Sequence, residues 1–197
     1  MESPVFIYEE RDANQIFDYW LGIIDRIEAS TITDGEDDTA IYNSQTIGYT
    51  LFPLIDSISF NLFGSGMRRY LRELNYSRNE ANIITLMFRN GMLHNTRAKR
   101  LKFRNTEVSW SLLSSNGNGG FFAFDEGYVD SENHEFDMPA ERPLEIIPLA
   151  NHEYNVMLSV DRLTAQVRHD LLRRKREFAE PTMNFIVGEE IDSDFRP

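Results

Sequence analysis

Apolar residues recur at intervals of three and four through the first part of the chain. This spacing predicts an amphipathic helix over Gln15–Ile27 and a longer helix over Tyr42–Phe63, in which Pro53 should introduce a kink. The segment Gly64-Ser65-Gly66 breaks the pattern, and a short helix over Met67–Leu74 should follow it. The expected buried stripe of the longer helix consists of Ile47, Leu51, Leu54, Ile55, Ile58 and Leu62.

A further helix should begin at Ser77. Ser77 and Glu80 have the spacing of a capping box, in which each side chain accepts a hydrogen bond from the backbone N–H of the other residue. Arg89 and Asn90 would then lie close to the C-terminal end of this helix. The residues expected to face the core are Ile83, Ile84, Met87 and Phe88.

The period of the pattern changes after residue 106. Val108, Trp110 and Leu112 alternate with polar residues, and a turn rich in Gly and Asn separates them from the apolar run Phe121–Phe124. This arrangement predicts a β-hairpin. Two further strands are expected over Leu144–Leu149 and Tyr154–Val160, and a last amphipathic helix, capped by Asp161, should extend to about Phe178.

These elements predict a mainly α-helical protein, an antiparallel helical bundle with a small antiparallel β-hairpin or sheet appended to it. We assign residues 1–179 to one domain, with the bundle over about 13–106, the β element over about 107–160 and the C-terminal helix over about 161–178. Residues 180–197 should form an acidic, partly disordered tail that contains a short strand at Phe185–Val187. With 197 residues, 41% of them hydrophobic, the chain can bury a core as one domain.

The formal net charge of −12 is unevenly distributed. Most of it lies in the turn-like segment Asp34–Asp38 and in the stretch from Glu177 to Pro197, so the rest of the chain is close to neutral. The segment 89–104 is basic and contains no acid; its cations are Arg89, Arg97, Lys99, Arg100, Lys102 and Arg104. Such a segment would attract a phosphate-rich ligand. The alternative is that it is a solvated helix end, where cations interact favourably with the helix dipole.

Composition argues against several classes of protein. The absence of cysteine excludes disulfides and thiolate metal sites and fits a reducing cytoplasm. The first residues include Glu2, Glu9 and Glu10 and lack an apolar core, so we expect no secretory signal. Pro53 and Asp56 interrupt the most apolar window, so we expect no membrane span. We expect no metal site, because three histidines stand apart without metal-site spacing: His134, His152 and His169. We also expect no cofactor, since the sequence has no Walker loop and no Gly-x-Gly-x-x-Gly motif.

Arg89, Asn90 and His94 bring a cation, a carboxamide and an imidazole together within six residues. The guanidinium of an arginine is a planar, permanently charged set of donors that suits a phosphoryl oxygen. A histidine can give or take a proton near neutral pH because its ordinary pKa is about 6.5. The three residues therefore form a candidate catalytic site for chemistry on a phosphodiester.

The spacing of the motif constrains how it could work. On an ideal α-helix, residues five apart are rotated by about 140° from one another, so a straight helix would point Arg89 and His94 apart. The helix could loosen at Gly91, or a two-fold dimer could bring two copies of the motif into one cleft. Structural roles are the alternative: His94 could bond the last carbonyls of its helix, and Arg89 could form an ion pair with an acid such as Asp56.

The pattern Arg89-Asn90-x-x-x-His94 resembles the signature of the HEPN superfamily, an arginine and a histidine with four to six residues between them and often Asn, Asp or His after the arginine. The likeness covers about residues 45 to 96. Leu51-Phe52-Pro53-Leu54-Ile55-Asp56, followed by Met87–His94, is similar to a bacterial HEPN group with a Phe-Pro-x-Ile-Asp helix and a Tyr/Phe-Arg-Asn-Gly-Leu-x-His segment. HEPN toxins paired with nucleotidyltransferase antitoxins have a tyrosine two residues after the histidine, where this chain has Thr96. Regulation by modification of that tyrosine is therefore not implied.

The resemblance implies a cytoplasmic homodimer that acts as a metal-independent endoribonuclease through attack of the RNA 2′-OH on its own phosphorus. Arg89, Asn90 and His94 would be the catalytic residues, and the biological role would be that of a toxin or a phage-defence protein, with an antitoxin or another protein as partner. One alternative is a non-catalytic HEPN dimer that binds RNA, a nucleotide or another protein. Another is a structural helical protein without a ligand. The implied RNA-binding residues are Arg97, Lys99, Arg100, Lys102 and Arg104.

Overall fold

A computed structural model describes residues 6–31, 37–91, 101–103, 106–115, 121–124, 144–148 and 154–189. The helices are α1 (Ala13–Thr31), α2 (Asp37–Phe63), α3 (Met67–Glu73), α4 (Arg78–Ile83), the π-helical turn η1 (Ile84–Arg89) and α6 (Val160–Glu177). The strands are β1 (Phe6–Asp12), β2 (Leu101–Phe103), β3 (Thr106–Ser115), β4 (Phe121–Phe124), β5 (Leu144–Pro148), β6 (Tyr154–Ser159) and β7 (Thr182–Glu189). The protein is thus mainly helical with a small sheet, as predicted.

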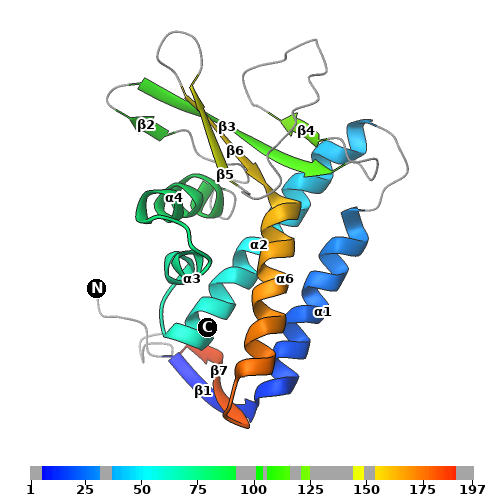
Figure 1. The fold of residues 1–197 in the computed structure, drawn as a ribbon, viewed down its shortest axis with the longest axis vertical. Helices are drawn as coiled ribbons and strands as arrows, with labels where there is room; N and C mark the ends of the chain where they lie inside the picture. The colour runs from blue at the N-terminus through cyan, green and yellow to red at the C-terminus, as the bar shows by residue number, and fades with distance from the viewer. Residues whose placement is uncertain are drawn as a thin grey trace, which may run out of the picture.

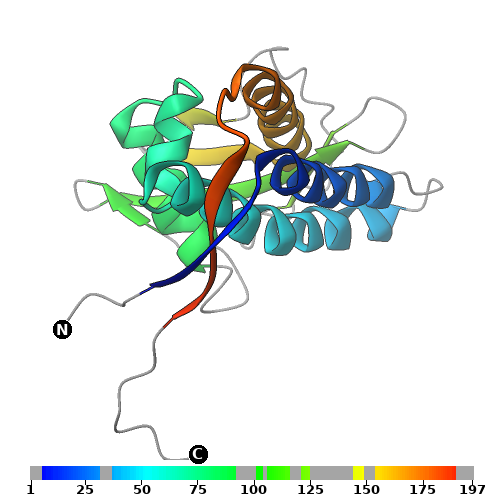
Figure 2. The same cartoon turned by 90° about the horizontal axis from the view of Figure 1, so that it is seen from below.

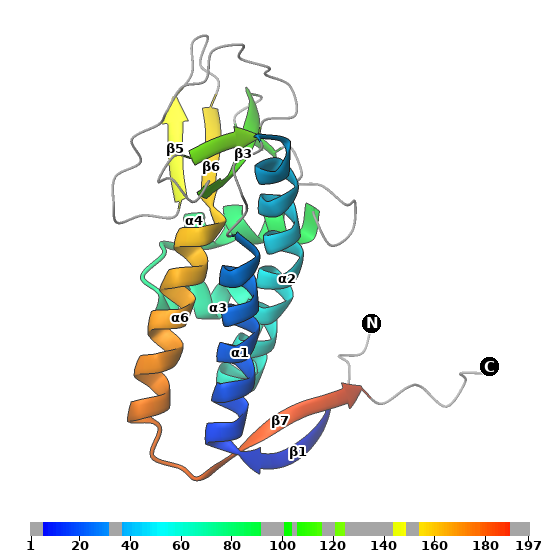
Figure 3. The same cartoon turned by 90° about the vertical axis from the view of Figure 1, so that its right-hand side faces the viewer.

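The three long helices α1, α2 and α6 run alongside one another and form the body of the molecule (Figure 1). The sheet of β2 to β6 lies at one end of these helices, and the ribbon of β1 and β7 lies at the other end (Figure 3). Seen from below, α1, α2 and α6 pack against one another, and α3 and α4 lie to one side (Figure 2). The site-bearing helix, α4 with η1, is therefore held between the body and the sheet.

The predicted helices are present, and the first two, α1 and α2, are longer than the periodic pattern indicated. Helix α1 begins at Ala13 because the Asp12 carboxylate accepts a hydrogen bond from the backbone N–H of Gln15 at 3.0 Å. Helix α2 begins at Asp37, inside the segment predicted to be a turn, and its first residues include two acids, which a helix N-terminus favours. Five of the six residues of the predicted α2 stripe are buried, with Leu51, Ile55 and Ile58 completely so, and Leu62 is only partly buried.

The last helix is capped differently from the prediction. Ser159, not Asp161, is the N-cap of α6, and its hydroxyl accepts a hydrogen bond from the backbone N–H of Arg162 at 3.3 Å. Asp161 instead lies in the first turn, where its negative charge suits the helix dipole. The prediction named the wrong residue because two good capping residues stand two positions apart in the sequence.

The predicted β-hairpin of β3 and β4 and the predicted antiparallel pair of β5 and β6 are both present. They join into one five-stranded sheet because β3 and β6 pair in parallel, with Trp110 opposite Val156. Strand β2 pairs with the start of β3, so the β element begins at Leu101 and not near residue 107. The turn predicted at 116–120 and the long segment 125–143 lie outside the described residues.

The two ends of the described chain pair with each other. Strands β1 and β7 are antiparallel, and β7 extends the predicted short strand at Phe185–Val187 into much of the segment assigned to a tail. The backbone N–H of Ile186 donates to the side chain of Asn61 on α2 at 2.8 Å, which fastens the ribbon to the helical body. Residues 190–197 of the predicted tail lie outside the described residues.

One hydrophobic core connects the helices with the sheet. Trp20, Phe52 and Phe88 are completely buried in it, and Trp110 of β3 joins it from the sheet. Among the described helices, none is both long and apolar enough to cross a membrane.

Candidate functional site

Two of the three predicted catalytic residues lie within the described part of the chain. Arg89 is the last residue of η1, and Asn90 follows it directly in helical conformation. His94 and the predicted RNA-binding residues Arg97, Lys99, Arg100 and Arg104 lie outside the described residues, and of Lys102 only the backbone, in β2, is described. The described part of the candidate site therefore consists of Arg89, Asn90 and their surroundings.

The helix that carries Arg89 is anchored at both ends. The predicted capping box is present, because the Ser77 side chain accepts from the Glu80 backbone at 3.2 Å and the Glu80 side chain accepts from the Ser77 backbone at 2.7 Å. At the other end, Phe88 is completely buried between Phe52 of α2, at a ring distance of 6.5 Å, and Trp110 of β3, at 6.3 Å. The residue directly before Arg89 is thus fixed by both the body and the sheet.

The last turn before Asn90 is a π-helix, which sequence periodicity did not predict. A π-helical turn has backbone hydrogen bonds between residues five apart, is rare, and occurs frequently at functional sites. In η1, Ile84, Met87 and Phe88 are completely buried and Arg89 is partly exposed. The Arg89 side chain therefore leaves the helix next to residues that are buried in the core.

The Arg89 guanidinium is held by two neighbours. Its Nε donates to Oδ2 of Asp56 at 2.6 Å, and its Nη1 donates to Oδ1 of Asn90 at 2.9 Å. The Asp56 side chain is 14% exposed and that of Arg89 29%. The second carboxylate oxygen of Asp56 accepts the backbone N–H of Met67 at 2.8 Å. One carboxylate thus connects α2, the start of α3 and the end of η1.

The contacts of Arg89 bear on both the catalytic and the structural interpretation that the sequence leaves open. The ion pair between Arg89 and Asp56 exists within one chain, as the structural interpretation expected. An arginine has five N–H donors, and two of those on Arg89 are bonded to described residues, which leaves three without a partner in the described part of the chain. A partly exposed guanidinium whose plane is fixed and whose outer donors remain can bind an oxyanion such as a phosphate.

The Asn90 side chain helps to hold Arg89, because its carbonyl oxygen accepts a hydrogen bond from Nη1 of Arg89. The expected catalytic role of Asn90 stays a prediction, because His94 lies outside the described residues. Asp56 was considered only as a structural partner of Arg89. The sequence does mark Asp56 as unusual, because it is the single charged residue between Asp38 and Arg68.

Four of the six cations of α6 are compensated by acids of α1 and of α6 itself, which weakens α6 as a second phosphate site. Arg168 contacts Asp25 and Glu28, and Lys175 contacts Asp18, all on α1. The hydrogen bond to Asp25 raises the pKa of Arg168, and a hydrogen bond to Asp170 likewise raises the pKa of Arg173. These contacts fasten α1 to α6.

A buried tyrosine lies beside the α6 acids. Tyr70 is completely buried, and its hydroxyl lies close to the Asp170 carboxylate but makes no hydrogen bond of ordinary geometry within the described residues. Burial, together with the negative charge of Asp170, raises the pKa of Tyr70 well above its ordinary value. Tyr70 therefore stays protonated and neutral in the folded protein at physiological pH.

Within the described residues, no group of three or more His, Cys, Asp or Glu side chains is arranged to hold a metal ion. Comparisons of the chain with protein-family models, with curated proteins and with solved structures find no match.

Proposed function

We propose that the protein is an endoribonuclease of the HEPN type, in which Arg89 binds the scissile phosphate and His94 transfers the proton. The observation that carries the proposal is the fixed, partly exposed guanidinium of Arg89, bonded on one side to Asp56 and Asn90 and retaining further donors. The motif resemblance of Arg89, Asn90 and His94 supplies the reaction class.

The reaction is a transesterification within the RNA. The 2′-OH loses its proton to a base, O2′ forms a bond to phosphorus, and the bond from phosphorus to O5′ breaks as O5′ takes up a proton. His94 serves as the general base or general acid, which contributes roughly 10² to 10⁴ in rate. Arg89 stabilises the extra negative charge on the phosphorane oxygens, and Asp56 and Asn90 hold the guanidinium in place for it. The chemistry requires the 2′-OH, so RNA and not DNA is the substrate.

The test is cleavage of RNA by the purified full chain and two variants. His94→Ala should abolish cleavage while RNA binding largely persists, because a neutral imidazole contributes proton transfer more than affinity. Arg89→Ala should weaken both cleavage and binding, because the same donors contact the ground-state phosphate. Cleavage by the wild type should persist in EDTA and leave 2′,3′-cyclic phosphate ends.

Matched controls exist on exposed surfaces elsewhere in the chain. His169 on α6 and Arg78 at the start of α4 are both exposed, so His169→Ala and Arg78→Ala should cleave like the wild type. If the wild type cleaves no RNA, or if His94→Ala cleaves as fast as the wild type, the ribonuclease proposal fails.

A second function is favoured by the ion pair between Arg89 and Asp56, which gives the arginine a structural partner within its own chain. In that case the protein is a non-catalytic HEPN module that binds RNA or another protein as a dimer. RNA binding that depends on Arg89, without any cleavage, would favour this function. Growth arrest or defence against phage would be the biological role of the catalytic form only.

A further inference from the structure

Strand β1 forms the outer edge of the ribbon that projects beyond the end of the long helices (Figures 2 and 3). Among the described strands it pairs with β7 alone, and all of its residues after Phe6 are exposed. The other edge of the ribbon faces the helical body, because the backbone N–H of Ile186 in β7 donates to Asn61 of α2 at 2.8 Å. The edge open to a partner is therefore that of β1.

The alternation of hydrogen bonds in the ribbon shows which backbone groups of β1 point outward. In an antiparallel pair, opposite residues either exchange both backbone bonds or point these groups away from each other, in turn. The N–H of Ile186 points to α2, so its partner Tyr8 points its own N–H and C=O away from β7. The bond from the Ala13 N–H to the Pro181 carbonyl gives the same alternation at the other end. The N–H and C=O groups of Tyr8 and Glu10 are thus directed outward and have no partner among the described residues.

A strand edge with unpaired backbone groups is a template for one more extended strand. The side chains of Tyr8 and Glu10 share one face of β1, because side chains alternate along a strand. The other face carries Arg11, whose guanidinium carbon lies 5.0 Å from the centre of the Phe185 ring and which is paired with Glu9. The Tyr8 side chain is 51% exposed. An apolar ring and an acid thus accompany the two sets of outward backbone groups.

Charge decides which strand this edge accepts. Strand β1 contains three acids and one arginine, a net charge of −2. The arginine is bonded to Glu9, whereas Glu10 has no ion-pair partner among the described residues. Opposite charges in neighbouring strands stabilise a sheet, and like charges directly opposite destabilise it. A second copy of this chain would bring the same acidic strand and a net charge of −12, so the edge favours a basic partner.

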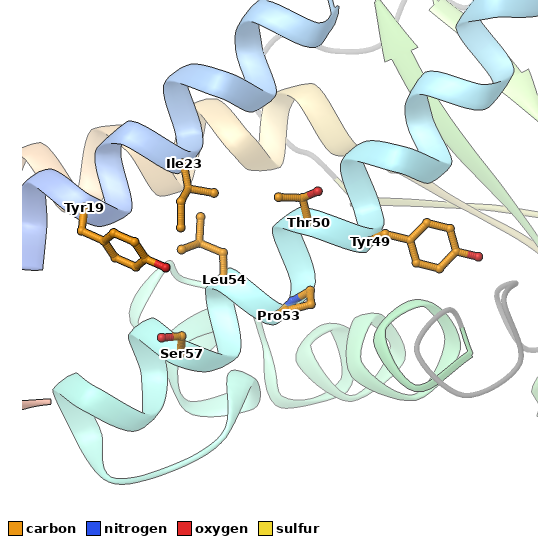
Figure 4. Close-up of a pocket in the computed structure, with 7 residues that line it drawn as sticks. All are labelled: Tyr19, Ile23, Tyr49, Thr50, Pro53, Leu54 and Ser57. Carbon is orange, nitrogen blue, oxygen red and sulfur yellow. The ribbon is translucent and has the colours of Figure 1, made fainter. Parts of the chain in front are cut away.

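The groove between α1 and α2, of 360 Å³, offers no such selection. Figure 4 shows Tyr19, Ile23 and Leu54 directed toward one another in it. None of its lining side chains is charged, so we assign no partner to it. The lining residues are Tyr19, Ile23, Tyr49, Thr50, Pro53, Leu54 and Ser57.

We propose that the outer edge of β1 binds an extended basic segment of another protein as a third, antiparallel strand of the ribbon. Antiparallel pairing is the more stable form per residue and continues the direction of the existing pair. Its outward groups bond two partner residues, one opposite Glu10 and one opposite Tyr8. In the antiparallel direction the segment reads Lys or Arg, any residue, and then an apolar residue. This contact does not rest on the proposed ribonuclease function.

A labelled peptide with blocked ends, Thr-Thr-Lys-Thr-Val-Thr-Thr, tests the contact by fluorescence anisotropy with the full chain. Replacing its Lys by Glu should weaken binding at least tenfold. N-methylation of its Lys and Val removes the donors to the carbonyls of Glu10 and Tyr8 and should weaken binding by a similar factor. N-methylation of the Thr between them is the control, because that N–H points away from β1, and binding should persist.

Three results with these peptides would overturn the proposal. No binding of the parent peptide at about 1 mM would exclude the contact. Equal binding of the Lys and Glu peptides would exclude selection by charge. Equal binding with and without N-methylation of Lys and Val would mean an ionic contact without strand pairing.

Charge reversal in the protein tests the position of the peptide. Glu10→Lys should bind the Lys peptide at least tenfold more weakly than the wild type and should bind the Glu peptide more tightly. The control is Glu180→Lys, the same change at an exposed acid in the connection from α6 to β7. At about 0.15 M salt its affinity should stay within about twofold of the wild type, because distant exposed charges are screened. Equal losses in both variants would contradict the edge as the binding site.

Amide hydrogen exchange shows which backbone groups the peptide covers. The N–H groups of Tyr8 and Glu10 should exchange at least tenfold more slowly with saturating peptide, whereas those of Glu9 and Arg11, directed to β7, should change less. Bound peptide without slowing at Tyr8 and Glu10 would place it elsewhere. Slowing without peptide that increases with protein concentration would mean that a second copy occupies the edge, and would overturn the basic partner.

Discussion

Asp56 is the residue on which the described part of the site depends. It accepts from Arg89 with one oxygen and from the backbone of Met67 with the other, at 2.6 and 2.8 Å. A carboxylate that is 14% exposed and has partners on both oxygens leaves the arginine little freedom to rotate. Its contribution is thus both to stability and to the direction of the guanidinium.

Asp56→Asn should lower the free energy of unfolding by about 1 to 3 kcal/mol, because it leaves a partly buried Arg89 charge without its counter-charge. Urea denaturation measures the change. The control is Glu9→Gln, which removes an exposed pair with Arg11 and should cost less than about 1 kcal/mol. In an Arg89→Met background the cost of Asp56→Asn should shrink. If the cost is the same in both backgrounds, the pair is not its cause.

Tyr70→Phe should leave the protein at least as stable at neutral pH, by up to about 2 kcal/mol, because it removes a buried hydroxyl that makes no hydrogen bond of ordinary geometry within the described residues. The pKa of Tyr70 is raised on folding, so the unfolded chain loses this proton first, near pH 10, and wild-type stability falls as pH rises beyond that. The advantage of the variant should therefore grow above about pH 10. A variant clearly less stable at neutral pH would contradict this account.

The residue types of the site could be predicted from the sequence, but the directions in which their side chains point could not. Arg89 was expected near a helix end and Asp56 was its expected structural partner, and both are found. What the pattern could not give is η1, because buried residues at 84, 87 and 88 are compatible with an α-helix as well as with a π-turn. The relation of Arg89 to His94 stays a prediction.

At the scale of elements, the helix formed by α4 and η1 depends on its first turn. It is short, and its start is held by the reciprocal bonds of Ser77 and Glu80. Short helices are marginal without such bonds and tertiary packing. The position of Arg89 is therefore linked to a cap about three turns away.

Ser77→Ala should lower the free energy of unfolding by about 1 kcal/mol, because it leaves the Glu80 backbone N–H without its acceptor. Asn79→Ala in the same turn is exposed and should change stability by less than about 0.5 kcal/mol. Thermal unfolding of both variants gives the comparison. Equal midpoints for the two variants would show that the cap contributes nothing measurable.

Local elements of the sheet could be predicted, and the pairings between distant strands could not. The hairpin of β3 and β4 follows from alternating apolar residues and a short connection, and the pair of β5 and β6 follows from two apolar runs. Strand β1 was missed because charged residues occupy its second half and its partner β7 lies at the other end of the chain. The parallel contact of β3 with β6 likewise leaves no signal in either strand alone.

At the scale of the whole molecule, two groups of cations have different roles. Arg168 and Lys175 of α6 face acids of α1, and Arg173 and Arg174 face Asp170, so these four cations contribute to packing and leave little field outside the protein. The segment 97–104 contains five cations and no acid. An RNA should therefore be attracted by the second group more than by the first.

The salt dependence of RNA binding tests this difference. Arg97→Ala with Lys99→Ala should reduce the slope of log affinity against log salt by about 1.4, since each lost phosphate contact with a single strand is worth about 0.7. The matched control is Arg168→Ala with Lys175→Ala in α6. It changes the net charge by the same amount but removes cations that are bonded to Asp25, Glu28 and Asp18. Its slope should stay that of the wild type. Equal reductions in both double variants would mean that RNA responds to total charge alone, and the assignment of the segment 97–104 to RNA binding would fail.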